Sequence, residues 1–342
     1  MTGTRTRTPA LASRPARPAR PPRHARPPRH AALRRQRGAA LLVAMVVLSV
    51  VATLAAGMVW QQWKAVQVET AERGRAQSAW ILTGALDWAR LILREDARSG
   101  RATSLNEPWA TPLAEARLST FLAADRDNTA DSGPEAFLAG SITDAQSRYN
   151  LRNLVADGKV VPAQRAVLQR LCVSAGLDAA TASLVADGLQ AAMAGEATAP
   201  LLPQQFSDLA WLGLDAASIE RLATVAVLLP VATPVNLNTA SREVLAGVVP
   251  GLDLGGADRL VQARVRQPFR TLAEASQVLG AAVPLEGGAV DVKSAYFEVR
   301  GRLRLADRVL QEQTLVERRP DLHVVAIQRQ RVAELSLGAP AR

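Results

Sequence analysis

The chain has 342 residues, of which 48% are hydrophobic, so it can bury a sizeable core and is too apolar to be disordered throughout. Its single cysteine, Cys172, excludes an intramolecular disulfide and any metal site built from several cysteines. The 41 basic and 31 acidic residues give a formal net charge of +10, a value typical of proteins that bind nucleic acid or anionic membranes.

The positive charge is concentrated in residues 1–38, which contain eleven arginines and no acidic residue. Residues 39–342 therefore hold 30 basic and 31 acidic residues and are close to neutral. The same first 38 residues are rich in proline and poor in large apolar side chains. We expect them to form a disordered basic leader, and the charge gives no reason to expect nucleic-acid binding by the rest of the chain.

Residues 39–63 are uncharged, and residues 39–60 are almost wholly apolar. A helix over 39–60 would be about 33 Å long, which matches the hydrocarbon core of a bilayer. The arginines before it place the N-terminus in the cytoplasm and the bulk of the chain outside it, so we predict a single-pass inner-membrane protein. A buried helix of a soluble protein and a cleaved signal peptide are the alternatives, although the apolar run is too long for the latter. The predicted anchor residues are Leu41, Leu42, Val46, Val47, Val50 and Trp60.

The junction before this segment joins basic residues, ending in Arg37, to Gly38 and then to an unbroken apolar run from Ala39. It resembles the leader of type IV prepilins and pseudopilins, and the resemblance implies cleavage after Gly38 by a prepilin peptidase and methylation of Ala39. Most such proteins carry glutamate at the fifth mature position, where this chain has Val43. A subunit at a filament tip has no neighbour above it whose amine could pair with that carboxylate, so Val43 fits a tip subunit. The alternative interpretation is that the helix is an ordinary membrane anchor.

The helix is predicted to continue to about residue 96, since residues 63–96 contain no proline. Apolar residues recur at helical spacing along this outer half, which predicts packing on a folded domain, and we assign the same stripe to contacts with partner helices. The stripe consists of Ala79, Leu82, Leu86, Ala89 and Leu93.

Helical patterns follow over residues 162–174, 178–194, 215–227, 241–249 and 257–266. The last two, with the turn between them and residues 269–275, form a helix-hairpin-helix pattern. Such a pattern can bind a DNA phosphate, but residues 239–290 carry five arginines and five acids, so helix packing is the favoured interpretation.

The C-terminal part is predicted to be β-structure. Apolar and charged side chains alternate over residues 297–305, and further strands are expected over 309–316 and 322–327. The alternating arginines are interpreted as the solvated face of an antiparallel sheet, with a basic binding face as the alternative.

Four segments stand out in order along the chain: Glu107–Leu113, Gly140–Leu154, Pro234–Ala240 and Ser294–Phe297. Together they resemble one family, general secretion pathway protein K, the minor pseudopilin at the tip of type II secretion systems. The departures from the family pattern are Ser147 in place of glycine and Arg152 in place of asparagine. The resemblance implies an α+β, pilin-like fold with a long N-terminal helix on an antiparallel sheet and a large inserted α-helical domain. It also implies assembly with minor pseudopilins I and J, with H as a further candidate, and a role in capping and nucleating the pseudopilus for protein export.

The expected organisation has five parts. These are the leader at 1–38, the transmembrane helix at 39–60, the outer helix and first part of the pilin-like domain at 61–155, the inserted helical domain at 156–290, and C-terminal strands at 291–342. The alternative function is a membrane-anchored DNA receptor of the competence type, which also joins one N-terminal helix to helix-hairpin-helix motifs.

The chain has no recognisable catalytic motif, and we expect it not to be an enzyme. Members of the resembled family bind calcium through an acid-rich loop in the helical domain. At the corresponding place the weak candidates are Asp187, Glu196 and Asp208, which are too few for the six to eight oxygen ligands that calcium prefers. We therefore expect no cofactor, with a weakened or missing calcium site.

Overall fold

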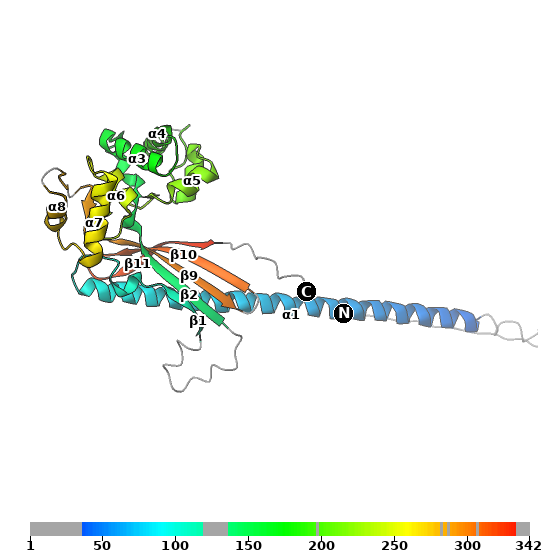
Figure 1. The fold of residues 1–342 in the computed structure, drawn as a ribbon. Coiled ribbons are helices and arrows are strands. Elements are labelled where there is room, and N and C mark those ends of the chain that lie inside the picture. The colour runs from blue at the N-terminus through cyan, green and yellow to red at the C-terminus, as the bar shows by residue number, and fades with distance from the viewer. Residues whose placement is uncertain are drawn as a thin grey trace, which may run out of the picture. The chain divides into compact units, whose positions relative to one another are not determined.

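The computed structural model describes residues 36–118, 136–195, 198–280, 283–285, 288–305 and 308–332 (Figure 1). The chain divides into two compact units, one ending at Ala71 and the other beginning at Glu72. Most of the predicted leader lies outside the described residues. The second unit contains a sheet with a helix against it and a group of shorter helices, so the predicted α+β fold class is confirmed.

The first element, α1, spans Gln36–Arg98 and thus contains both the predicted membrane segment and the predicted outer half. The chain has no proline between these bounds, and the helix ends where Gly100 adopts a positive φ of 65°. The prediction of a helix to about residue 96 is therefore confirmed.

Five antiparallel strands form the main sheet in the order β1-β2-β9-β10-β11. In the second unit these strands lie against α1 (Figure 1). The strands are β1 (Leu113–Arg117), β2 (Ala136–Asp144), β9 (Tyr296–Leu305), β10 (Arg308–Arg318) and β11 (Val324–Val332).

The core between α1 and the sheet is built by the apolar stripe of the helix. Leu82 packs with Leu138 and Leu303, whereas Leu86, Ala89 and Leu93 pack with Trp109, Phe297, Val299 and Val316. These four helix residues are buried, and Ala79 is half-buried. The stripe therefore covers the chain's own sheet, and its assignment to partner-helix contacts is wrong for the four buried residues.

The shorter helices are inserted between β2 and β9, which are neighbours in the sheet with Asp144 opposite Phe297. They share one core that runs from Tyr149 to Val292, and two short parallel strand pairs, β3–β6 and β7–β8, close the insertion. The helices are α3 (Pro162–Ser174), α4 (Ala180–Ala194), α5 (Ala216–Leu222), α6 (Arg242–Val248), α7 (Leu254–Arg266) and α8 (Leu272–Leu279).

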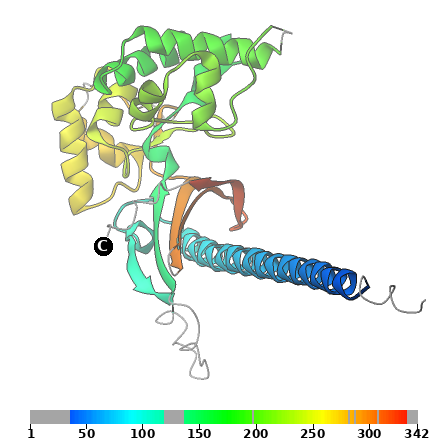
Figure 2. The same cartoon turned by 90° about the vertical axis from the view of Figure 1, so that its right-hand side faces the viewer.

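Short pieces complete the insertion. Its 3-10 turns are η3 (Ala145–Ser147), η4 (Leu151–Leu154) and η5 (Phe206–Leu212), whereas a further turn, η1 (Pro108–Ala110), lies between α1 and β1. The two-residue strands are β3 (Tyr149–Asn150), β4 (Val155–Ala156), β5 (Lys159–Val160), β6 (Ala226–Val227), β7 (Val235–Asn236) and β8 (Val290–Asp291). Figure 2 shows the helices of the insertion, α3 to α8, in green and yellow.

The alternation predicted for β9 is present, with Phe297, Val299, Leu303 and Leu305 buried and Arg300 and Arg302 exposed. Glu298 departs from it, because this side chain is buried and pairs with Arg148 of the insertion. The insertion thus covers part of the sheet face that the sequence alone indicated to be solvated.

Candidate interaction surface and interdomain junction

The membrane segment is fully exposed within its own unit. Its most apolar 18-residue window has a mean hydropathy of 2.6 and no buried residue, and the helix is long and apolar enough to cross a bilayer. All six predicted anchor residues, Leu41, Leu42, Val46, Val47, Val50 and Trp60, are exposed. This combination fits a single-pass membrane anchor, because lipid is the solvent that such a surface requires.

An aromatic and basic group follows the apolar run. The rings of Trp60 and Trp63 stack at 5.3 Å between centroids, and Lys64 Nζ lies 5.3 Å from the centroid of the Trp60 ring. Tryptophan and lysine with these amphipathic contacts favour the boundary between hydrocarbon and water. Residues 60–64 therefore fit the interfacial end of such an anchor.

The predicted processing residues lie at the beginning of the same helix. Arg37 and Gly38 are within its first turn, and Ala39 and Val43 are exposed on it. Cleavage and methylation at this junction stay predictions.

On its second half, α1 has an exposed apolar face on the side opposite the stripe. Trp80 is 77% exposed, Trp88 50% and Leu91 43%, and a Cβ atom at Gly84 would meet no atom within 4 Å. At 3.6 residues per turn these four positions fall within about 80° of arc, opposite the stripe that packs on the sheet. We call Trp80, Gly84, Trp88 and Leu91 the outer face. Exposed apolar clusters of this kind mark interaction sites.

The outer face was not predicted from the sequence, although the sequence contains a signal for it. Two tryptophans lie half a helical turn away from the apolar stripe, where an isolated domain would place polar residues.

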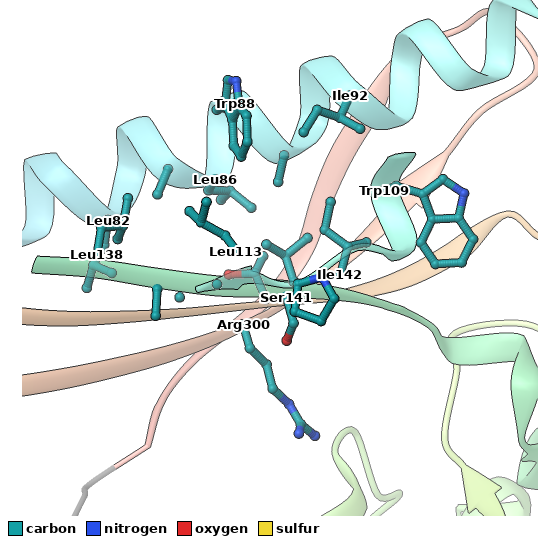
Figure 3. Close-up of a pocket in the computed structure, with 18 of the residues that line it drawn as sticks. Leu82, Leu86, Trp88, Ile92, Trp109, Leu113, Leu138, Ser141, Ile142 and Arg300 are labelled. Atoms are coloured by element: carbon teal, nitrogen blue, oxygen red, sulfur yellow. The ribbon is translucent and has the colours of Figure 1, made fainter. Parts of the chain in front are cut away.

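A cavity of about 280 Å³ lies between α1 and the sheet, and the half-exposed Trp88 is the one residue of the outer face that also lines it (Figure 3). Small residues leave this space, since Ala85 and Ala89 of α1 oppose Ala139 and Gly140 of β2. Figure 3 shows the Arg300 side chain pointing away from α1, so the lining on the helix side is mainly apolar.

The motifs on which the family resemblance depends meet at the junction between sheet and insertion. Asp144 Oδ2 accepts hydrogen bonds from Thr239 Oγ1 and Ser294 Oγ at 2.6 Å each and from Asn236 Nδ2 at 2.9 Å. Its Oδ1 accepts from the Gln146 backbone N–H at 2.8 Å. Burial raises the pKa of Asp144, and the hydrogen bonds from Ser294 and Thr239 oppose that rise.

The motif asparagines satisfy buried backbone groups. Asn150 bonds the carbonyl of Val231 and the N–H of Leu229, and Asn153 bonds both the N–H and the carbonyl of Thr233. Asn238 Nδ2 donates to the carbonyl of Phe269, and Asn238 Oδ1 accepts from the Phe269 N–H, both at 2.9 Å. A side-chain amide can donate and accept at once, so asparagine suits these positions, and the role of these motif residues is structural.

The two departures from the family pattern are accommodated locally. Ser147 Oγ donates to the carbonyl of Asp144 at 2.7 Å, and its backbone does not require the positive φ that favours glycine. Arg152 donates to the carbonyls of Leu229 and Pro203 at 3.3 and 3.1 Å. Burial lowers the pKa of its guanidinium.

The helix-hairpin-helix segment is formed by α6, α7 and the turn at Gly251, where φ is 77°. Asp253 caps α7, and its Oδ1 accepts from the Gly256 N–H at 2.7 Å. This carboxylate occupies the helix N-terminus that a DNA phosphate would need. A Cβ atom at Gly247 would meet Leu171 Cδ2 at 2.4 Å, so α6 packs closely on α3. These contacts favour the structural interpretation.

The acidic calcium candidates already have other partners. Asp187 pairs with Arg165, and Asp208 Oδ2 accepts from the backbone N–H groups of Gln204 and Gln205 at 3.0 Å each. Glu196 lies outside the described residues. Within the part of the chain that the structure describes, no three histidine, cysteine or acidic side chains form a group that could hold a metal ion.

Comparisons with known proteins agree on one family. The family model described as Type II secretion system (T2SS), protein K, matches residues 235–293. Type II secretion system protein K of Pseudomonas aeruginosa is 28% identical over 304 residues, which cover 80% of this chain and 86% of that protein. Protein K of Dickeya chrysanthemi is also 28% identical, over 85% of this chain and 96% of that protein.

A solved structure shares the fold. The crystal structure of the GspK-GspI-GspJ complex from the enterotoxigenic Escherichia coli Type 2 Secretion System matches with a TM-score of 0.57 and 17% identity, over 77% of this chain and 99% of the matched chain. The resemblance to protein K, first seen in the motifs, is thereby confirmed.

Proposed function

Because the chain is similar to protein K of type II secretion systems along most of its length, we propose that it is the minor pseudopilin at the tip of a type II pseudopilus. It is a non-enzymatic assembly subunit, held in the inner membrane by residues 39–60 with its N-terminus in the cytoplasm and its bulk in the periplasm. A prepilin peptidase cleaves after Gly38, and its partners are minor pseudopilins I and J, with H as a further candidate.

The observation that carries this proposal is the outer face of α1. One side of the helix packs on the chain's own sheet. On the other side Trp80, Trp88 and Leu91 keep 77%, 50% and 43% of their surface exposed among the described residues. Burying one tryptophan side chain against another helix gains about 2–3 kcal/mol. A related fold is described in a complex of GspK with GspI and GspJ, and this supports helical partners of the same kind here.

The place of the insertion supports a capping role. It leaves the sheet between Asp144 and Tyr296, at the end where Arg318 of β10 pairs with Asp96 in the last turns of α1. The insertion is thus anchored at the end of α1 that is farthest along the chain from the membrane segment. Bulk at that end blocks the addition of a further subunit above it, and Val43 supplies no carboxylate to meet one.

The test is co-purification of the full chain with its system's minor pseudopilins I and J. Trp80→Ala and Trp88→Ala are each expected to weaken the complex by tenfold or more, since about 1.4 kcal/mol of lost burial corresponds to a tenfold change. Trp211→Ala is the matched control, because Trp211 is also 50% exposed but lies in the insertion. An intact complex with both α1 variants, or a loss caused only by Trp211→Ala, would contradict the proposal.

A further inference from the structure

Two acidic side chains and one arginine are buried together where α1 ends. The side chains of Asp96 and Arg318 are only 7% and 10% exposed, and Arg318 Nη1 lies 2.6 Å from Asp96 Oδ2. Arg318 Nη2 donates to Thr103 Oγ1 at 2.7 Å and to the carbonyl of Ser294 at 2.8 Å. One positive charge thus matches one carboxylate, and the pair joins α1 to β10 and to the interdomain junction.

The second carboxyl group, that of Glu107, accepts hydrogen bonds from neutral donors of the described residues. Its Oε2 accepts from Trp109 Nε1 at 2.6 Å and from the Ser104 N–H at 3.3 Å, and Glu107 is itself buried. Burial raises the pKa of Glu107 most, the hydrogen bond from Trp109 opposes the rise, and the charge of Asp96 adds to it. An ionised Glu107 would be a second buried negative charge beside a pair that is already neutral.

A third observation comes from Asp96 itself. Its Oδ1 atom is buried and accepts no hydrogen bond from any of the described residues. Such an orphaned acceptor is costly, and a buried carboxylate oxygen beside a second carboxyl group is satisfied when the two share a proton.

We propose that Glu107 is protonated in the folded protein and donates its proton to Asp96 Oδ1, so that Glu107, Asp96 and Arg318 form one neutral buried cluster. The proton is assigned to Glu107 because the other oxygen of Asp96 already accepts from the Arg318 guanidinium at 2.6 Å. The charged side chain that acts on Glu107 is Asp96 from α1. Arg318 from β10 pairs with Asp96, and Asp144 reaches the cluster through Ser294.

The cluster makes the attachment of α1 to the junction sensitive to pH. The pKa of Glu107 is higher in the folded than in the unfolded chain, so its proton stabilises the folded state fully below the ordinary glutamate pKa. This stabilisation is lost as the pH rises through the raised value, where two adjacent carboxylates share a single arginine.

The experiment is thermal unfolding of the full chain in detergent at several pH values from 5 to 8.5, for the native sequence and for Glu107→Gln. The glutamine amide can donate to Asp96 Oδ1 and accept from Trp109, and it cannot ionise. The midpoint temperature of the native chain is expected to fall relative to Glu107→Gln as the pH rises, by about 3 °C or more for a domain of this size. Asp87→Asn is the control, because Asp87 is an exposed acid of the same helix that pairs with Arg90.

Two further measurements make the result decisive. Infrared spectra at neutral pH should show a protonated carboxyl band in the native chain that Glu107→Gln lacks. Trp109→Phe removes the hydrogen-bond donor that favours the ionised form of Glu107. The fall in the unfolding midpoint should therefore occur at higher pH in this variant. The proposal is overturned if the band is absent from the difference spectrum, or if the temperature difference between the native chain and Glu107→Gln does not change with pH.

Discussion

Replacing Asn236 by alanine tests whether the motif residues stabilise the fold through hydrogen bonds to buried backbone groups. Asn236 is fully buried, and its Nδ2 donates to the carbonyl of Thr103 at 3.1 Å while its Oδ1 accepts from the Asn238 N–H at 2.9 Å. Asn236→Ala removes these bonds from two buried backbone groups. It also removes one of the bonds to Asp144, whose Oδ2 keeps Thr239 and Ser294.

The expected loss follows from the two backbone groups. Each buried polar group left without its bond costs about 2 kcal/mol, so the free energy of unfolding should fall by roughly 4 kcal/mol. For a domain of this size that corresponds to a drop of about 10 °C in the midpoint of thermal unfolding.

The assay is thermal unfolding of the full chain in detergent, at constant pH because burial raises the pKa of the neighbouring Asp144. Gln190→Ala is the control, since it removes a single hydrogen bond at the surface, from Gln190 Nε2 to the carbonyl of Gly158, and should shift the midpoint by about 2 °C or less. A drop of similar size in both variants would refute the structural role. Asn236 would then need an explanation through binding.

Three further predictions concern the cavity, the hairpin segment and calcium. Ala85→Leu should raise the unfolding midpoint by about 3 °C, because part of the cavity of about 280 Å³ beside Ala85 is filled, and a lower midpoint would show that no such space exists. Asp253→Ala should cost about 1 kcal/mol through the lost cap of α7, without DNA binding in a gel-shift assay at moderate salt, and a shifted DNA band would restore the receptor alternative. Exchanging a chelator for excess calcium should leave the midpoint of thermal unfolding unchanged. A bound calcium ion, at a free concentration of 100 times its dissociation constant, would stabilise the folded state by about 2.7 kcal/mol, and a raised midpoint would contradict the prediction.

Elements with a strong local signal could be predicted from the sequence. The helix predicted at 162–174 has the observed bounds of α3, since Pro162 begins it and the chain turns at Gly176. β9 was predicted from its period-two pattern. β2 was not assigned to a strand, because Ala, Gly, Ser and Thr within it give no clear alternation.

The interaction surface was harder to predict for a physical reason. A stripe such as Leu82, Leu86 and Leu93 shows that one helix face is buried, and it does not show whether the chain's own sheet or a partner covers it. The same limit applies to Glu298, whose burial depends on Arg148 about 150 residues earlier. Only the fold distinguishes the face that is already covered from the outer face that remains available.

The most direct test of the central claim is site-specific photo-cross-linking in cells that assemble the secretion system. A photoreactive phenylalanine analogue at position 88, in the outer face of α1, is compared with the same analogue at position 211, which is equally exposed in the insertion. The account predicts that position 88 cross-links to minor pseudopilin I or J and that position 211 does not. Cross-links to these partners from position 211 but not from position 88 would contradict it.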